Sequence, residues 1–237
     1  MRTSSDSINQ FLERWEWFRL LPNSLRELTL QTVVERHADA GDYIAREGMP
    51  STHWYGLLKG YLQMYVVGSD GTETTLYCLR EGEWGGDGSL LKNEMRRYDL
   101  RALTDAHICC IPKDTFETLR GNSIQFNHFL TEVMNTRMGA FVTMLVATRL
   151  LRPEVRVARG LLMVAKDNTD RLQALDLSQH ELSLICGLSR QRVNIALADL
   201  KRLGVVTIEP KKGMLFVNLQ LLRTYALSEG NLDHLAS

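Results

Sequence analysis

The chain has 237 residues, of which 44% are hydrophobic, and its 28 basic and 28 acidic side chains give a formal net charge of zero. That length suffices for one large core or two smaller ones, and the composition excludes a low-complexity or bilayer-spanning protein. The N-terminus lacks the apolar core of a signal peptide, so we expect a cytoplasmic protein that makes no membrane contact. The four cysteines show no metal-ligand spacing, and we predict no metal site.

The first 122 residues change from helical to strand-like patterns. Residues 8–32 carry apolar side chains at helical spacing, whereas residues 33–112 form short β-favouring runs separated by glycines. Asp70-Gly71 lies between two such runs and predicts a hairpin. Short strands with regular turn signals are typical of a compact antiparallel β-roll or jelly roll.

A long helix is predicted over residues 123–151. Its apolar side chains form two adjoining stripes, so one stripe can pack on the β-roll while the other pairs with a partner helix. The second stripe comprises Leu130, Met134, Met138, Phe141, Leu145 and Thr148. A single wide core-facing stripe in a monomer is the alternative. Arg152-Pro153 ends the helix, because the residue before a proline disfavours helical geometry, and this joint is a natural hinge.

Residues 153–237 contain two short helices joined by a tight turn. Ser178 and Glu181 form a capping box at the start of the first helix, and Gly187 permits the turn. A second capping serine, Ser189, opens a helix that we predict over about 189–203. Because one face of this second helix is apolar and the other polar, the pattern indicates a helix-turn-helix with an exposed recognition helix.

A β-hairpin is predicted directly after the recognition helix. Two β-favouring runs, 205–208 and 214–217, flank a turn that carries Lys211 and Lys212. Between residues 190 and 223 there are seven basic side chains against two acidic ones, although the whole chain is neutral. Local positive charge of this kind attracts phosphate, so the C-terminal region is predicted to be a winged helix-turn-helix that binds DNA.

This order of elements resembles the cyclic-AMP receptor protein/FNR (CRP/FNR) family of bacterial transcription regulators, over nearly the whole chain. Two parts of the sequence match the family most specifically. The first is a set of short glycine-containing segments at 40–42, 47–48, 57–60, 70–71 and 81–83, and the second is Gly187-Leu188-Ser189-Arg190-Gln191 at the start of the recognition helix. The resemblance implies an α+β protein with an N-terminal cyclic-nucleotide-binding-like sensor domain (1–122), a dimerisation helix and hinge (123–152) and a winged helix-turn-helix domain (153–237).

The resemblance also implies how such a protein would act. Members form homodimers through the long helix and insert one recognition helix from each subunit into successive major grooves of a pseudo-palindromic double-stranded DNA site. A signal in the β-roll changes the pose of the two DNA-binding domains, and an activator would also contact RNA polymerase. We therefore expect a sequence-specific transcription regulator.

Matching positions assign roles to the residues of the recognition helix. Arg190, Gln191 and Asn194 would read base edges, because arginine pairs with guanine, and glutamine or asparagine with adenine. Ile195 stands where some members have a further base-contacting arginine, so the DNA site should differ; it would touch a thymine methyl group or belong to the core. The full predicted DNA-binding set, including phosphate contacts, is Ser189, Arg190, Gln191, Arg192, Asn194, Lys201, Lys211 and Lys212.

The predicted effector site departs from the family's cyclic-nucleotide cassette. Asp87 replaces a ribose-binding glutamate, and Arg97-Tyr98 replaces the small residues that follow the phosphate-binding arginine. These departures argue against cyclic AMP, although two arginines beside a glycine-rich turn could bind another anion or pair with Glu94 or Asp99 at the surface. The candidate effector residues are Gly86, Asp87, Arg96, Arg97 and Phe141.

Other cofactors and activities are also disfavoured. An iron–sulfur cluster would need an N-terminal cysteine cluster, yet no cysteine precedes Cys78. Haem would need an axial ligand, and the available histidines are isolated in the sequence: His37, His53, His107 and His128. The glycine-rich segment 82–88 matches no phosphate-loop or dinucleotide fingerprint, and we predict no catalytic residue.

The sequence leaves two functional hypotheses. The first is the DNA-binding regulator, whose effector, target genes and direction of regulation stay open. The second is an effector-binding barrel module whose C-terminal helices contact a protein partner instead of DNA.

Overall fold

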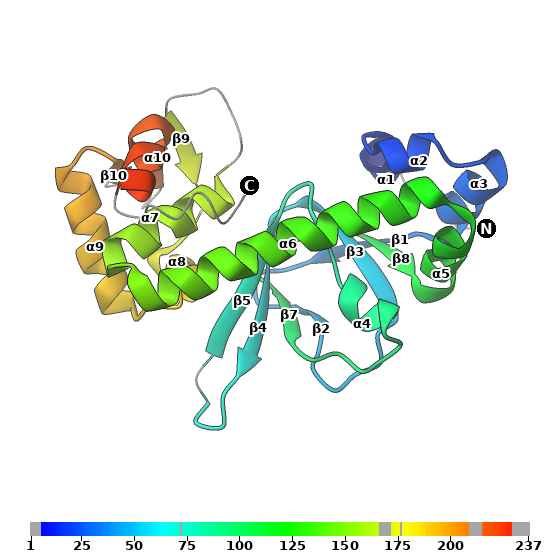
Figure 1. The fold of residues 1–237 in the computed structure, drawn as a ribbon, viewed down its shortest axis with the longest axis horizontal. Helices are drawn as coiled ribbons and strands as arrows, with labels where there is room; N and C mark the ends of the chain where they lie inside the picture. The colour runs from blue at the N-terminus through cyan, green and yellow to red at the C-terminus, as the bar shows by residue number, and fades with distance from the viewer. Residues whose placement is uncertain (1–5, 72, 166–171, 176, 209–214, 229–237) are drawn as a thin grey trace. The chain divides into compact units, whose positions relative to one another are not determined.

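The computed structural model describes residues 6–71, 73–165, 172–175, 177–208 and 215–228 (Figure 1). The chain divides into two compact units, one made of residues 1–66 and 79–137 and the other of residues 67–78 and 138–237. None of the described helices combines the length and apolar character that a membrane crossing requires.

The first unit begins with three helices, α1 (Asp6–Glu13), α2 (Glu16–Arg19) and α3 (Asn23–Thr32). Each turns apolar side chains inward, among them Ile8, Leu12 and Phe18, which are all completely buried. A helix face with such a stripe is stable only when the stripe is covered. These helices therefore form one wall of the core that the following strands complete.

The strands that follow form the predicted antiparallel β-roll. One four-stranded sheet has the order β1-β8-β3-β6, and its members are β1 (Val34–Ala38), β8 (Ala106–Pro112), β3 (His53–Lys59) and β6 (Trp84–Gly85). The other has the order β2-β7-β4-β5, with β2 (Tyr43–Ala45), β7 (Asp99–Ala102), β4 (Tyr61–Val67) and β5 (Glu73–Arg80). The pairs β1–β8, β3–β8, β3–β6, β2–β7 and β4–β7 are antiparallel.

Two short helices lie in and after the strand region. Helix α4 (Asp87–Leu91) follows β6, and α5 (Lys113–Asn122) follows β8. The long helix α6 (Ile124–Leu150) comes next, with Ser123 accepting a hydrogen bond from the backbone N–H of Phe126 at 3.2 Å. This bond satisfies one of the amide groups that a helix start leaves without an intrahelical partner.

An aromatic cluster fixes the first half of α6 on the β-roll. Trp54 and Trp84 stack with ring centroids 3.9 Å apart, and Phe126 of α6 meets Trp17 edge-to-face at 5.0 Å. Aromatic pairs of this kind contribute about 0.5–1.5 kcal/mol beyond the burial of their area. Gly56 is required here, because a Cβ at that position would lie 2.9 Å from the Trp84 ring. The tryptophans of this cluster thus serve packing.

The second unit contains the C-terminal helices and a small sheet. Helix α7 (Pro153–Val164) starts at the predicted proline and is followed by β9 (Leu172–Leu175), α8 (Gln179–Cys186) and α9 (Arg190–Arg202). Strands β10 (Val206–Ile208) and β11 (Leu215–Asn218) then pair antiparallel, β9 joins them in the order β10-β11-β9, and α10 (Leu219–Ser228) ends the described chain.

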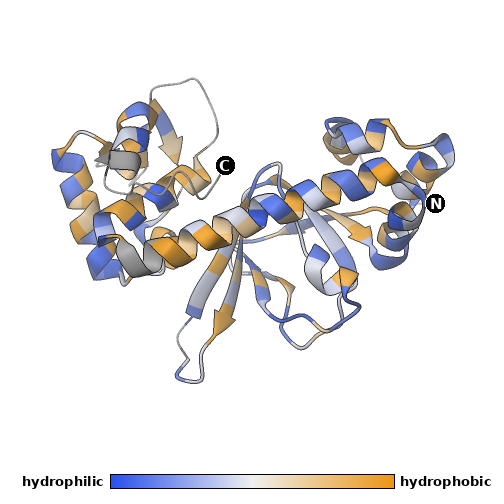
Figure 2. Ribbon diagram, in the orientation of Figure 1, coloured by the Kyte–Doolittle hydropathy of each residue, from blue (hydrophilic) through white to orange (hydrophobic). Residues whose placement is uncertain are grey.

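The second half of α6 leaves apolar side chains uncovered. Phe141 packs edge-to-face on Tyr77, whereas Met138 and Leu145 are 61% and 54% exposed. Hydrophobic residues recur along this part of the helix (orange in Figure 2). Met134, one turn before Met138, is also exposed. The members of the predicted second stripe therefore differ. Leu130 is buried in the first unit, whereas the side chains of Met134, Met138 and Leu145 are exposed.

Candidate nucleic-acid interface

The first helix of the helix-turn-helix begins with the predicted capping box. The Oγ of Ser178 accepts from the backbone N–H of Glu181 at 3.2 Å, and the Glu181 carboxylate accepts from the backbone N–H of Ser178 at 2.5 Å. Two otherwise unpaired amide groups are satisfied reciprocally, which fixes the residue at which α8 starts.

The turn between α8 and α9 depends on Gly187, whose φ of 59° and ψ of 40° lie in the left-handed region. Few other residues adopt that conformation without strain. The Arg156 guanidinium, from α7, donates to the carbonyls of Cys186 and Gly187 at 2.9 and 3.2 Å. Burial lowers the pKa of Arg156 from its ordinary value. Arg156 is a positioning residue that the sequence analysis missed, because it lies about thirty positions from the turn it holds.

Close packing behind the turn sets the spacing of α7 and α8. A Cβ on Gly160 would lie 2.5 Å from the Sγ of Cys186, so only glycine allows this approach. Cys186 is buried, and burial raises its pKa to about 12. Its thiol is therefore a packing group that stays protonated at neutral pH.

Helix α9 separates its apolar and polar side chains as the sequence predicts. Val193, Leu197 and Leu200 are at most 2% exposed and pack toward the unit's core. The Oγ of Ser189 caps the helix by accepting from the backbone N–H of Arg192 at 3.4 Å. The predicted DNA-binding side chains within the described residues are all exposed: Ser189, Arg190, Gln191, Arg192, Asn194 and Lys201.

The first two turns of α9 bring the proposed base-reading residues together. Arg190, Gln191 and Asn194 project from positions one and three apart, so they share the side of the helix that faces solvent. Ile195, which the sequence left as either core or surface, is 58% exposed. It therefore extends the same exposed surface with an apolar side chain.

Contacts within the motif organise its charges. The Nε of Arg190 donates to the Nδ1 of His180, on α8, at 3.0 Å. Asp199, the single acidic residue of α9, forms an ion pair with Arg202 in the last turn. The negative charge is thus neutralised locally, and the exposed surface of α9 is positive. His180 is a further residue of this surface that the sequence analysis did not single out.

The wing is present as strands β10 and β11, which confirms the predicted hairpin. Lys211 and Lys212, assigned to its tip, lie outside the described residues. The register pairs Val206 with Val217 and Ile208 with Leu215. This pairing brings the ends of the strands at residues 208 and 215 to the same edge of the hairpin.

The candidate effector residues of the β-roll are engaged with protein groups. Arg96 is 2% exposed and donates to the carbonyls of Gly86 and His53 at 3.0 and 2.7 Å. It also lies over the Tyr55 ring, 5.3 Å from the centroid. Gly86 is left-handed, and a Cβ there would lie 2.9 Å from the Arg96 guanidinium. Arg96 therefore binds backbone at the place where the resemblance expects a phosphate ligand.

Asp87 and Arg97 have protein partners as well. The Oδ1 of the buried Asp87 accepts from the Nη1 of Arg137 at 2.7 Å, and Arg137 also bonds the carbonyl of Trp84. Arg97 is exposed and pairs with Glu94 at 2.8 Å, which is the surface pairing left open by the sequence. Phe141 contacts Tyr77 in the second unit. Arg137, which α6 supplies, was missed because nothing in its local sequence indicates a partner fifty residues away.

Two sequence models of known domains match the chain. The cyclic nucleotide-binding domain matches residues 35–123, and the Crp-like helix-turn-helix domain matches residues 155–225. Together the two ranges cover more than half of the chain. The first includes the β-roll and the second includes α8, α9 and the wing, so each match falls on a part already described from its geometry.

Individual proteins are similar over most of their length. The chain is 23% identical over 207 residues to the anaerobic regulatory protein of Bacillus subtilis, covering 80% of this chain and 82% of that protein. It is 24% identical to the CRP-like cAMP-activated global transcriptional regulator of Mycobacterium tuberculosis, covering 85% and 92%. The solved structure of FixK2 from Bradyrhizobium japonicum superposes with a TM-score of 0.71 at 20% identity, covering 81% and 96%. The structural likeness establishes a common fold.

Proposed function

The chain belongs to the CRP/FNR family of transcription regulators, and we propose that it acts as a homodimer that reads a pseudo-palindromic double-stranded DNA site through α9. Residues 153–237 are the DNA-binding domain in this proposal, residues 123–152 the dimerisation helix and hinge, and residues 1–122 the sensor domain. An activator of this design would also contact RNA polymerase. No catalytic role is assigned to any residue.

The exposed polar start of α9 carries the proposal. Arg190, Gln191 and Asn194 offer the donors and acceptors that recognise base edges, and the capped turn holds them on a rigid helix. The apolar side of the same helix is buried, so its polar side can enter a groove without loss of packing. Ile195 adds an apolar group suited to the methyl group of thymine.

Phosphate contacts would fix the register of the helix on the duplex. Arg192 and Lys201 are exposed on α9, and Ser189 lies at its start, where helix N–H groups attract phosphate. Lys211 and Lys212 complete the proposed set on the wing. These contacts carry no sequence information, and they make the affinity dependent on salt.

The exposed apolar side chains of α6 support the homodimer. Met134, Met138 and Leu145 are separated by four and seven residues, which is the spacing of a coiled-coil seam. A second copy of the helix would remove these side chains from water, at roughly 25 cal/mol per Å² of apolar area buried. The dimer would then place two recognition helices about 34–36 Å apart, one turn of DNA.

We assign no effector to the β-roll. The Mycobacterium tuberculosis relative is described as cAMP-activated, but here Arg96 is buried against two carbonyls and Asp87 against Arg137. The Arg96 guanidinium, which would bind a cyclic phosphate, therefore donates its hydrogen bonds to backbone carbonyls instead. These contacts support the expectation that cyclic AMP is not the effector, because Arg96 would have to leave both carbonyls to bind its phosphate.

Selection from random duplex DNA with the full-length protein tests the proposal. We expect enrichment of a pseudo-palindrome, a dimer by sedimentation, and an affinity that falls roughly 10³–10⁵-fold between 50 and 200 mM salt if 6–10 phosphates are contacted. A monomer that enriches no sequence would contradict the proposal and favour a module with a protein partner.

A further inference from the structure

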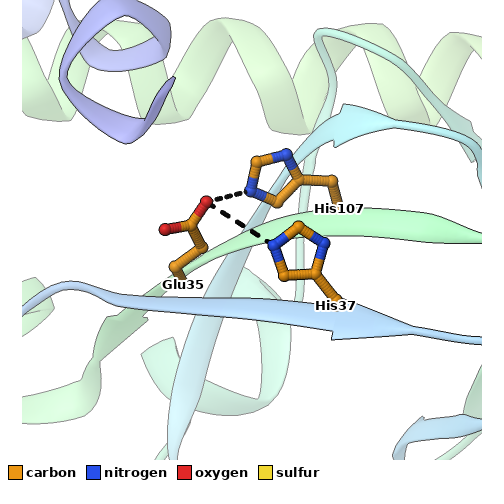
Figure 3. A group of neighbouring side chains, drawn as sticks. All are labelled: Glu35, His37 and His107. Atoms are coloured by element: carbon orange, nitrogen blue, oxygen red, sulfur yellow. Dashed lines mark hydrogen bonds and ion pairs between the residues drawn. The ribbon is translucent and has the colours of Figure 1, made fainter. Parts of the chain in front are cut away.

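Three side chains with metal-binding atoms meet on the sheet that contains β1 and β8. Glu35 and His37 are two residues apart on β1, so they project from the same face of the strand. The register of the antiparallel pair places His107 of β8 directly opposite His37. Figure 3 shows the two imidazoles side by side, with the Glu35 carboxylate directed at both.

The distances among these groups are close to those of a metal shell. The Oε1 of Glu35 lies 2.5 Å from the Nε2 of His107 and 3.7 Å from the Nε2 of His37, and all three ligand atoms lie within 4.8 Å of one another. Ligands about 2.0–2.2 Å from a tetrahedral zinc ion are separated by roughly 3.3–3.6 Å. The His37 separation exceeds this range by about 0.1 Å, and the 2.5 Å separation to His107 would have to lengthen by about 0.8 Å for both groups to bind one ion.

The cluster is rigid on one side and accessible on the other. The side chains of His107 and Glu35 are 18% and 25% exposed, whereas His37 is 73% exposed. The two imidazoles stack with centroids 4.3 Å apart and planes 16° apart. Strand pairing fixes the backbones of the two histidines. Because a metal lies in the plane of each imidazole that binds it, the exposed His37 ring would turn out of the stack to share one ion with His107, and the ion would approach from the His37 side.

A further hydrogen bond orients the carboxylate. The Oγ of Ser7, on α1, donates to the Oε1 of Glu35 at 2.9 Å. Outer partners of this kind hold metal ligands in place and commonly change metal affinity 10–100-fold when removed. Ser7 therefore gives Glu35 the kind of support that metal-binding carboxylates have in other proteins.

We propose that Glu35, His37 and His107 bind a divalent transition metal ion of the zinc type. Two imidazoles and one carboxylate are the donor set of many zinc sites, whereas magnesium and calcium prefer oxygen alone. Binding through Nε2 would require each imidazole to carry its proton on Nδ1, and water would complete the coordination. The ion would link β1, at the edge of its sheet, to β8.

Zinc titration of the full-length protein by calorimetry tests this site directly. We expect one zinc ion per chain, and at least tenfold weaker binding in His37→Ala and in Glu35→Gln. His37 is mostly exposed, so its replacement should leave the fold intact, and circular dichroism checks this. His128→Ala is the matched control, because His128 is an exposed histidine on α6 and its loss should change nothing.

Two further measurements distinguish a built site from general surface binding. Ser7→Ala should weaken zinc binding about 10-fold, the lower end of the range for outer partners. Zinc, but not magnesium, should raise the melting temperature of the wild type and leave that of His37→Ala unchanged. Equal zinc binding by the wild type and His37→Ala, or none by the wild type, would overturn the proposal, whatever the outcome for DNA binding.

Discussion

On α9 of the second unit Arg190 and Arg192 are exposed, whereas in the first unit Arg96 is 2% exposed and Arg137 of α6 forms an ion pair with a buried carboxylate. All four arginines lie in segments for which the sequence predicts DNA binding, effector binding or dimerisation. The difference lies in what surrounds them. Capping and helical amphipathicity turn the first pair outward, while backbone carbonyls and Asp87 hold the second pair inside.

The two regions also differ in how a ligand could use them. A guanidinium that faces solvent can exchange water for phosphate or base edges at little structural cost. A guanidinium that already satisfies buried carbonyls must leave them unpaired before it can bind anything else, and an unsatisfied buried group costs about 1–3 kcal/mol. Arg96 and Arg137 therefore stabilise the fold of the first unit, and the α9 arginines are available for recognition.

The largest predicted effect is on Arg137. Replacing Arg137 by alanine leaves the Asp87 carboxylate buried without its partner, which should lower the free energy of unfolding by about 3–5 kcal/mol. Urea unfolding of the full-length protein measures this. Arg97→Ala is the matched control, because its ion pair is exposed and should change stability by only about 0–1 kcal/mol. Equal losses in both variants would remove the distinction between buried and exposed arginines.

The second effect concerns base recognition. Arg190→Ala should reduce discrimination between the selected DNA site and single-base variants by about 1–3 kcal/mol, mainly at one position. Arg192→Ala should instead weaken binding to all sequences alike and lower the salt slope by about one unit. Fluorescence anisotropy on a panel of duplexes separates the two results. If both variants lose the same discrimination, the division into base-reading and phosphate-binding arginines is wrong.

The difference between the regions also explains what the sequence could predict. The capping box, Gly187 and the buried face of α9 are local features, each readable within a few residues, and the structure confirms them. The β-roll followed from strand-like runs and glycine turns. Strand β9 was missed, because its four residues are defined by pairing with β11, some forty positions away. Helices α4, α5 and α10 were also missed: α4 has only five residues, and α5 and α10 each follow a strand directly.

Contacts between residues that are distant in sequence could not be predicted either, because they too depend on the tertiary structure. Arg137 meets Asp87 across fifty positions, and His107 meets Glu35 across seventy-two. Glu35 and His37 alternate on one strand, which is a weak signal of two ligands on one face, but the third ligand appears only with the register of β1 and β8. The sequence therefore predicted no metal site, whereas the structure brings three donors together.

The third effect concerns the stability that the N-terminal cap gives to α8. Ser178→Ala removes the acceptor for the Glu181 amide and should lower the free energy of unfolding of the second unit by about 1 kcal/mol. Ser178→Thr keeps a hydroxyl and should remain close to the wild type. Thermal or urea unfolding followed by circular dichroism provides the measurement. If Ser178→Ala lowers the free energy of unfolding as much as is expected for Arg137→Ala, the exposed cap would be as important for stability as the buried ion pair.

The smallest effect concerns Ile195, the apolar group on the exposed side of α9. If it contacts a thymine methyl group, Ile195→Ala should cost about 0.8 kcal/mol per methyl group buried at that contact. Replacing the thymines of the selected site one at a time by uracil removes the methyl group from the DNA side. The wild type should then lose affinity at one thymine of each half-site, and Ile195→Ala should show no further loss there. Equal sensitivity of both proteins to uracil would assign the thymine contact to another residue and leave Ile195 as an exposed side chain without a role in recognition.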